Sequence, residues 1–588
     1  MNIVITAEGI VSAIGNGEAE VAESLRSRKS GVGEMRYLRS RHRELPVGEV
    51  KMSSAEMKSA LGLPATEEVS RTSLMGMMAI RQFAHTLPAV DRQSADSLRI
   101  VLISGTTVGT MDITENHYRN ILEENDLSFF ICHGCGGSSR RIADYFGCFS
   151  DVATVSTACS SAANAIVLGA NMIKAGMADI VVAGGSEALS RFHLNGFNSL
   201  MILDRERCRP FDETRRGLNL GEGAAYVVLE SEEHARGRGA EVHAYLAGYG
   251  NACDAFHQTA SSDNGEGAYL AMREALMMSG LRPEDIQYVN AHGTGTPNND
   301  QSEGVALQRI FGERMPLVSS TKAFTGHTTS ASGSIEAVIC ILAMQQGFVP
   351  ANLGWKCQMP GGITPTLGAD DVKLKNVVCN SFGFGGNDTS LVFSRERPAG
   401  SADAYNPEIK VSVLAKVEIS SEEELSDIRK YVKPLAARRM GRLMKSSLLS
   451  SLKALEQAGV DMPDAVITGT AYGCLENTEK LLRQIDEEDE ETVSPTFFMQ
   501  STHNTIGSNI AIRLGCHGYN STYSQLGDSL RWAMLDAGLL IRSGKCKTVL
   551  VGCHDESTPT LNAVLEKLGM PYPDSPVHSV AMVLSCGE

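Results

Sequence analysis

The strongest constraint on the fold is an internal repeat. Residues 128–187 align to 496–555 without a gap, at a constant separation of 368 residues. An earlier pair of segments, "VLISGTTVGTMDITE" (101–115) and "AVITGTAYGCLENTE" (465–479), lies 364 residues apart. Similar hydrophobic patterns arise by chance between α/β proteins, but a gap-free register of this length does not. The chain therefore carries two copies of one folding unit.

The repeat covers half of a larger unit. The change in separation falls near the acidic run "DEEDEE" (486–491), which predicts an enlarged solvated loop. "GAAYVVL" (223–229) is echoed by "SVAMVLS" (579–585) close to the last residue given. Residues 231–397 have no counterpart, so the second copy lacks whatever chemistry that segment carries.

Short apolar runs alternate with longer helical patterns, which indicates α/β layers. A stretch rich in Pro, Gly and polar residues, "RPAGSADAYNPE" (397–408), is typical of a linker. The predicted organisation is an N-terminal half at 1–230, a second half at 231–397, a linker at 398–409 and a degenerate copy of the N-terminal half at 410–588.

Composition restricts the class of protein. The chain has 588 residues, of which 43% are apolar and 21% charged, as in folded globular domains. No signal peptide and no 18-residue uncharged apolar run is found, and the 14 cysteines follow no regular spacing, so we expect a cytoplasmic protein without a membrane span. A net charge of −16 argues against nucleic-acid binding, and an acidic partner would need a local basic patch.

Cys159 lies in "ATVSTACSSAANAI" (153–166), where a predicted strand runs into a helix rich in small residues. Unpaired backbone N–H groups and the helix dipole at that point predict a lowered thiol pKa and donors for an oxyanion. A buried structural cysteine is the alternative, and it describes most cysteines. A nucleophile needs partners from elsewhere in the chain.

Three further segments supply such partners. "NAHGTGTPNND" places His292 at the end of a strand, and "STKAFTGHTTSASGS" places His327 before a helix, five residues after Lys322. Glycines in "NSFGFGGND" (380–388) predict a tight turn with exposed N–H groups. Taken singly, each histidine is more often an ordinary loop residue.

Together, in this order, "STACSS", "RPFDETRRGLNLGEGAAYVVLE", "NAHGTGTPNND", "STKAFTGH" and "NSFGFGGND" strongly resemble the β-ketoacyl synthases, condensing enzymes of the thiolase superfamily. The resemblance spans residues 1 to about 397. It implies a five-layer αβαβα fold of two similar halves. It also implies a homodimer, or a heterodimer with another ketosynthase, built largely on the N-terminal half.

The resemblance also implies the reaction. Cys159 would take an acyl group from an acyl carrier protein, and malonyl-carrier would then lose CO₂ and condense with it to give a β-ketoacyl product. Substrates would arrive on the phosphopantetheine of the carrier, with no cofactor and no metal in the enzyme itself. The product could belong to fatty acid, aryl polyene or polyketide synthesis.

Roles carried over from the family concern eight residues. His292 and His327 would bind the malonyl thioester carbonyl, and Lys322 would order His327. The N–H groups of Cys159 and Phe384 would form the oxyanion hole. The remaining assignments are a gate at Phe384, pantetheine contacts at Thr294 and Thr296, and a structural or electrostatic position at Glu336.

Differences from relatives favour the elongating, carrier-dependent class. A thiolase would carry a second cysteine near the C-terminal glycine turn, whereas "NSFGFGGND" has none. Initiating synthases carry Cys-His-Asn, whereas this chain offers two histidines. The family's apolar "PFFVPM"-like segment is replaced by "SFFICHGCGGSSRRIADYFG" (128–147). Its Cys132-x-x-Cys135 could be a redox or metal pair, although pocket-lining thiols are the favoured interpretation.

The appended copy places Gly527 opposite Cys159 and has no counterpart of either histidine. It could replace a partner's N-terminal half as an internal pseudo-dimer or scaffold, which we favour. It could also dock carrier protein through "ARRMGRLMK" (437–445), although a solvated helix face is the simpler interpretation, or be an inert lobe. Its histidines, His503, His517 and His554, are predicted surface or loop residues. For the whole chain, the alternative is a non-catalytic scaffold resembling a chain-length factor, partnering another ketosynthase.

Overall fold

The N-terminal half forms a sheet whose strands are buried on both faces. The computed structural model describes residues 1–88, 98–123, 127, 134–398, 405–571 and 575–587. Strand order in this half is β4-β3-β5-β6-β1, with β3, β4 and β5 parallel and β6 antiparallel to its neighbours. The bounds are β1 Ile3–Ser12, β3 Ile100–Gly105, β4 Asp151–Val155, β5 Ile180–Glu187 and β6 Gly223–Ser231.

The second half repeats this arrangement. Its order is β7-β13-β12-β8-β9, and three paired residues of β1 and β7 join it to the first half. The bounds are β7 Ala244–Cys253, β8 Tyr288–Asn290, β9 Leu317–Ser319, β12 Asn376–Gly383 and β13 Asn387–Ser394.

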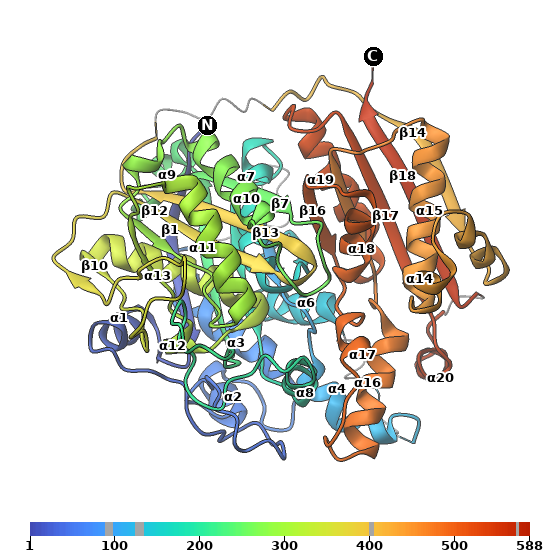
Figure 1. Ribbon diagram of the computed structural model, residues 1–588, viewed down its shortest axis with the longest axis horizontal. Coiled ribbons are helices and arrows are strands. Elements are labelled where there is room, and N and C mark those ends of the chain that lie inside the picture. The colour runs from blue at the N-terminus through green and yellow to red at the C-terminus, as the bar shows by residue number, and fades with distance from the viewer. Residues whose placement is uncertain (89–97, 124–126, 128–133, 399–404, 572–574, 588) are drawn as a thin grey trace.

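Helices complete five layers (Figure 1). Two helices that are buried over nearly their whole length, α7 (Ser161–Lys174) and α13 (Ser332–Gln346), pack between the two halves of the sheet. The outer faces are covered by α3 (Arg71–Arg81) and α6 (Cys135–Phe146) on one side and by α10 (Glu266–Ser279) and α11 (Pro297–Phe311) on the other. The predicted αβαβα fold of two similar halves is confirmed.

The appended half has the strand order of the N-terminal half. The order β16-β15-β17-β18-β14 matches β4-β3-β5-β6-β1, and α7 and α19 are 368 residues apart at both ends. The bounds are β14 Val411–Ile419, β15 Ala465–Gly469, β16 Tyr519–Tyr523, β17 Thr548–Glu556, β18 Val577–Cys586, α15 Arg442–Ala458, α18 Thr505–Leu514 and α19 Ser529–Arg542. The predicted domain boundaries stay predictions, and residues 399–404 of the linker lie outside the described residues.

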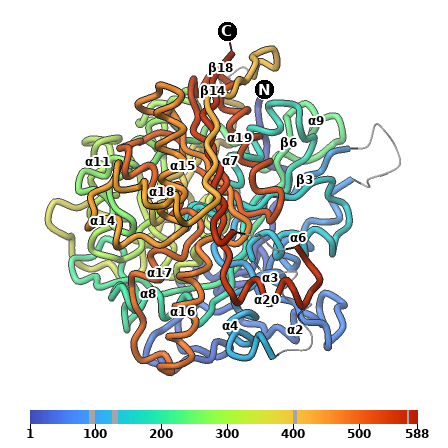
Figure 2. The backbone as a smooth tube through the Cα atoms, turned by 90° about the vertical axis from the view of Figure 1, so that its right-hand side faces the viewer, coloured from blue at the N-terminus to red at the C-terminus, as the bar shows by residue number. Residues whose placement is uncertain are grey.

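The two copies meet edge to edge. β16 pairs antiparallel with β4 at Tyr523 and Val155, which makes one continuous sheet. Ser156 N–H donates to the Thr522 carbonyl (2.9 Å), and Ser524 N–H donates to the Thr154 carbonyl (3.0 Å). Thr522 and Ser524 are the repeat equivalents of Thr154 and Ser156, so a local two-fold axis relates the two hydrogen bonds, as in an isologous dimer. Figure 2 looks onto the appended half, whose orange and red elements lie in front of the rest of the chain.

Shorter elements surround this framework. The helices are α1 Glu18–Arg26, α2 Ser54–Leu61, α4 Met111–His117, α8 Arg191–Ser199, α9 Glu232–Gly237, α12 Lys322–Thr325, α14 Pro434–Arg438, α16 Leu475–Glu487, α17 Pro495–Met499 and α20 Pro559–Lys567. The short strands are β2 Gly15–Asn16, β10 Phe348–Val349 and β11 Ala369–Asp370. Among the described residues, helices that combine the length and the apolar character of a bilayer span are absent.

Two predictions about the appended half were wrong in part. The acidic run is not wholly solvated: Glu490 is buried and accepts hydrogen bonds from Ser40 and, at 2.8 Å, from Asn195 Nδ2. Of the three histidines, His517 is exposed and His503 lies in the turn before α18, as predicted, whereas His554 lies in a strand. His554 is fully buried because β17 is an inner strand, and His503 is buried at the seam between the copies.

We predict that ending the chain at residue 409 changes its assembly state. Without β16, β4 becomes an edge strand with unpaired backbone groups, which promotes pairing with other chains. Light scattering coupled to gel filtration should show dimers or aggregates that the full-length chain does not form. A truncated chain with the assembly state and the activity of the full-length chain would contradict this.

Candidate active site

Cys159 lies on a sharp turn between β4 and α7. The preceding residue, Ala158, has a left-handed φ of 51°, and the turn Ala158–Ser160 leads directly into α7. Ser161 Oγ accepts from Thr157 N–H (2.9 Å) and donates to the Ala158 carbonyl (2.6 Å). These bonds satisfy the backbone of the turn, so the small polar residues of "STACSS" fix the position of the sulfur. In the copy, Leu526 has the same backbone conformation, with φ of 48°.

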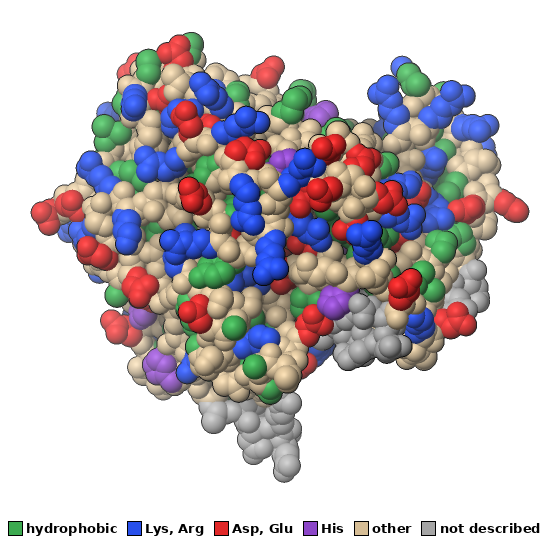
Figure 3. Space-filling view, turned by 90° about the horizontal axis from the view of Figure 1, so that it is seen from below, with side chains coloured by type: hydrophobic (Ala, Val, Ile, Leu, Met, Phe, Trp, Pro, Cys, Tyr) green, Lys and Arg blue, Asp and Glu red, His purple; other side chains and the backbone are tan. Residues whose placement is uncertain are grey.

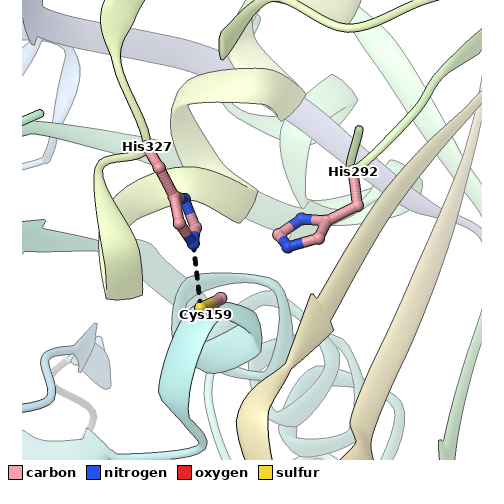
Figure 4. A group of neighbouring side chains, drawn as sticks. All are labelled: Cys159, His292 and His327. Atoms are coloured by element: carbon pink, nitrogen blue, oxygen red, sulfur yellow. Dashed lines mark hydrogen bonds between the residues drawn. The ribbon is translucent and has the colours of Figure 1, made fainter. Parts of the chain in front are cut away.

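His327 approaches the sulfur directly. Its Nε2 lies 3.0 Å from Cys159 Sγ, and its Nδ1 lies 3.1 Å from Ser332 Oγ at the start of α13. Figure 4 shows the two histidines converging on Cys159 from one side. The His292 and His327 ring centroids are 5.3 Å apart. The structure thus brings together the three residues that the sequence placed far apart.

Lys322 fixes the tautomer of His292. Its Nζ lies 3.3 Å from His292 Nδ1 and 2.6 Å from Glu336 Oε1, and all three groups are buried. An ammonium group can only donate, so His292 Nδ1 accepts and the ring proton resides on Nε2. His292 therefore offers an N–H donor on its other ring nitrogen. The prediction that Lys322 orders His327 is revised, because its hydrogen bond goes to His292.

Glu303 on α11 was missed by the sequence analysis. Its carboxylate accepts the N–H groups of His292 (2.8 Å) and Gly293 (2.7 Å), which anchors the backbone below the His292 ring. Burial raises the pKa of Glu303 to about 7, partly offset by these backbone hydrogen bonds. Nothing in "NNDQSEG" distinguishes this acid from the solvated acids of an ordinary helix.

The thiol is less acidic than its place at a helix start predicts. Burial raises the pKa of Cys159 to about 12, although Lys322 and the amide of Phe384 act in the opposite direction. Burial and the charge of Lys322 also hold the pKa of both histidines well below the usual value. Cys159 and His327 therefore form a neutral pair at pH 7, in which the S–H group donates to Nε2.

The sulfur opens into a cavity of about 380 Å³. Phe384, Thr294 and Thr296 all line it, as do Asp254 and Asp388. The Thr294 and Thr296 hydroxyls lie 2.9 Å from each other. The backbone amide of Phe384 faces Sγ, as an oxyanion donor would.

A metal at this site is disfavoured by its charge. Cys159, His292 and His327 each offer one ligand atom, and these atoms lie within 4.8 Å of one another. However, the Lys322 ammonium lies against His292, and a cation would meet its positive charge. The residues do not fit a metal centre.

The proposed Cys132–Cys135 pair is only half described, because Cys132 lies outside the described residues. Cys135 is buried at the seam, with Sγ 3.7 Å from His503 Nδ1. These two residues are also equivalent positions of the repeat, 368 residues apart.

Fold and site together define a thiol acyltransferase of the thiolase-like class. The family descriptions "Beta-ketoacyl synthase, N-terminal domain" and "Beta-ketoacyl synthase, C-terminal domain" match residues 1–235 and 243–356, and a second N-terminal domain matches 415–588. The chain belongs to the β-ketoacyl synthase family, enzymes that condense acyl units in fatty acid or polyketide synthesis.

Similar proteins support this assignment. Nodulation protein E of Rhizobium meliloti (strain 1021) is 32% identical over 407 residues, covering 67% of this chain and 99% of that protein. 3-Oxoacyl-[acyl-carrier-protein] synthase 2 of Vibrio cholerae is 30% identical over 417 residues, covering 67% and 99%. The solved structure "PfaC Keto synthase-Chain length factor" covers 100% of this chain and 78% of its own, with a TM-score of 0.81 and 15% identity, which shows a shared fold.

We predict that alkylation of Cys159 by iodoacetamide speeds up about tenfold per pH unit from pH 7 to 10, because the thiolate fraction grows until the pH reaches the raised pKa. Mass spectrometry of the Cys159 peptide gives the rate. A small free thiol, with a pKa of about 8.5, is the control and should level off above about pH 9. A plateau for Cys159 below pH 9 would show that the helix start outweighs burial.

Proposed function

We propose that this chain is an elongating β-ketoacyl-[acyl-carrier-protein] synthase, which condenses an acyl group on Cys159 with malonyl-carrier. The observation that carries the proposal is the 3.0 Å contact between Cys159 Sγ and His327 Nε2, with His292 alongside. A nucleophile, a base for its proton and a second donor are the minimum set for thioester exchange followed by condensation.

In the first step, Cys159 exchanges thioesters with the acyl carrier. Sγ attacks the acyl carbonyl as its proton passes to His327 Nε2, and the N–H groups of Cys159 and Phe384 hold the oxyanion. The bond to the carrier sulfur breaks, and that thiolate takes the proton. Because the resting thiol is neutral, proton transfer to His327 accompanies the attack.

In the second step, malonyl-carrier binds with its thioester carbonyl facing His292 Nε2–H. The C–CO₂ bond breaks, CO₂ leaves, and its electron pair forms an enolate that His292 stabilises through Nε2–H. His327 contributes in the same way once its ring proton is on Nε2. The enolate carbon attacks the acyl carbonyl, and the Cys159 thiolate leaves and takes up one proton. The product is β-ketoacyl-carrier, two carbons longer than the acyl group.

Thr294 and Thr296 are proposed to bind the pantetheine arm, since their hydroxyls lie in the wall of the cavity above the sulfur. Phe384 is proposed as the gate of that cavity. Lys322 and Glu336 hold His292 rather than transfer protons, because their charged groups hydrogen-bond to each other and neither residue lines the cavity.

The carrier protein is proposed to dock on the appended half. A hollow of about 830 Å³ there is lined by basic residues of the predicted cluster, including Arg438, Arg439 and Lys445. Figure 3 shows Lys and Arg side chains gathered at the corner of the molecule on the side of this half. Met499, beside the hollow, contacts Thr259 of the catalytic cavity wall, so a carrier bound here sits next to the entrance.

The appended half is proposed to take the place of a partner's N-terminal half. The two-fold seam supports an internal pseudo-dimer, as does the full-length likeness to a structure whose title names a ketosynthase and a chain-length factor. The competing function is a non-catalytic scaffold for another ketosynthase. The complete Cys-His-His group favours the enzyme.

The pathway is proposed to be a specialised one, such as aryl polyene or polyketide synthesis, rather than housekeeping fatty acid synthesis. The appended half and the unusual 128–147 segment motivate this choice. Carrier primers of varied length and aromaticity, assayed with malonyl-carrier, distinguish the pathways by the products formed.

We predict that Cys159→Ala abolishes both the acyl-enzyme and condensation, to less than about 0.1% of wild type, because no other nucleophile reaches the acyl group. Intact-mass measurement after incubation with acyl-carrier gives the acyl-enzyme. Cys357→Ala removes an exposed thiol and is the control that stays acylated. A wild type that no acyl-carrier acylates would favour the scaffold function.

We predict that the double change Arg438→Glu and Arg439→Glu raises KM for carrier-bound substrates about tenfold and leaves kcat unchanged, because charge at a rim mainly alters association. Acyl-pantetheine substrates without carrier should be unaffected. Arg28→Glu with Lys29→Glu makes the same charge change at two exposed residues just after α1 and is the matched control. An equal KM in both double variants would place docking elsewhere.

A further inference from the structure

The gate turn of the catalytic site is hydrogen-bonded to the appended half. Asn504, the residue before α18, donates from Nδ2 to the Phe384 carbonyl (2.7 Å) and to Asn387 Oδ1 (2.8 Å). Asn504 is buried, with 1% of its surface exposed. A side chain of the non-catalytic copy thus reaches the residue whose amide faces the Cys159 sulfur.

This contact ends a buried chain of amide side chains. The chain runs from the Phe384 carbonyl, through two side chains of the appended half, back to Thr157 beside Cys159. Phe384 is half-buried, and all the other members are at most 4% exposed, so the hydrogen bonds among them are shielded from water. Beyond Asn504, the bonds are Asn387 Nδ2 to Asn520 Oδ1 (2.9 Å), Asn520 N–H to Asn251 Oδ1 (2.9 Å), Asn251 Nδ2 to Asn164 Oδ1 (2.9 Å) and Asn164 Nδ2 to Thr157 Oγ1 (2.9 Å).

The turn cannot fix its own conformation. Gly385 and Gly386 follow Phe384 with φ of 83° and 77°, and glycine moves freely among such conformations. A Cβ on Gly385 would lie 2.1 Å from Ser508 Oγ on α18, so the appended half abuts the turn. Hydrogen bonds from outside the turn therefore hold it: Gly385 N–H donates to the Gln258 carbonyl (2.7 Å), Asp254 N–H donates to the Gly386 carbonyl (2.8 Å), and Asn504 binds the carbonyl of Phe384 itself.

The ring of Phe384 is supported from the same side. It stacks on Phe197 of α8 with centroids 5.6 Å apart, and Phe498 of α17 packs against Phe197 at 5.2 Å. A Cβ on Gly196 would lie 2.1 Å from the Phe498 ring, so that contact is close. The appended half thus contacts Phe384 directly through its backbone and indirectly through its ring.

We infer that Asn504 is a positioning residue for the condensation: the appended half holds the Phe384 amide in place as an oxyanion donor over Cys159. This rests on the proposed function. The carbonyl and the N–H of Phe384 belong to the peptide groups on either side of its Cα, so a hydrogen bond that holds the carbonyl also limits rotation of the N–H. An oxyanion donor acts only within about 2.7–3.1 Å of the developing charge, so an N–H that rotates away loses its effect. The copy without a nucleophile therefore completes the active site of the other half.

The test compares two reactions of the same thiol in Asn504→Leu, which keeps the side-chain volume and removes the donor. Acyl transfer from acyl-carrier passes through an oxyanion, whereas alkylation by iodoacetamide does not. Single-turnover acylation of Cys159 should fall about tenfold to a hundredfold, with alkylation within about threefold of wild type. A ratio of the two rates that changes less than fivefold overturns the inference.

Asn509→Leu, on the same helix, is the matched control, because its side-chain nitrogen has no hydrogen-bond partner among the described residues. Its ratio of rates should equal that of wild type. If Asn504→Leu does not fold, as thermal unfolding will show, Asn504→Asp replaces the donor by an acceptor and is judged by the same ratio. If acyl-carrier does not acylate the wild type, the proposed function is overturned. If the wild type and the Asn504 variant are both acylated, with the same ratio of acylation rate to alkylation rate, only the role of Asn504 is overturned.

Discussion

The pairing of β4 with β16 is the contact on which the rest of the arrangement depends. Two hydrogen bonds related by a local two-fold axis make the edge of β4 complementary to its own copy, and they continue the sheet across the seam. The turn that carries Cys159 begins at Ala158, three residues after Val155, at the end of this paired strand. The edge of β4 that the appended half covers therefore lies next to the nucleophile, and the appended half reaches the active site.

The site works by charge placement in a dry environment. Lys322 and Glu336 neutralise each other under His292, and Glu303 holds the backbone beneath it. The ion pair keeps His292 neutral with its N–H facing the cavity, and burial keeps the Cys159 proton in place. Water exclusion strengthens each donor that faces a developing oxyanion.

The repeat was predicted from the sequence itself, because its register runs without a gap over sixty residues. The five layers and the meeting of Cys159 with His292 and His327 were predicted from the resemblance of the motifs to the β-ketoacyl synthases. Contacts between distant elements that no motif marks were not predictable. Glu303 and Asn504 act through burial that no neighbouring residue signals. The thiol pKa was predicted with the wrong sign, because a helix start is visible in sequence and the layer that covers it is not. His554 was misplaced for the same reason.

The left-handed residue before the nucleophile has a wider meaning. Ala158 and Leu526 share one backbone conformation, yet Cys159 is 5% exposed and Gly527, in the same place, lies at the surface. Strand, turn and helix are thus a neutral scaffold that sets only where a side chain stands. Exposure of that side chain to water depends on the second half of the fold, which covers the turn at Cys159 and has no counterpart over the turn at Gly527. The chain therefore contains the same turn twice, once with a buried nucleophile and once with an exposed glycine.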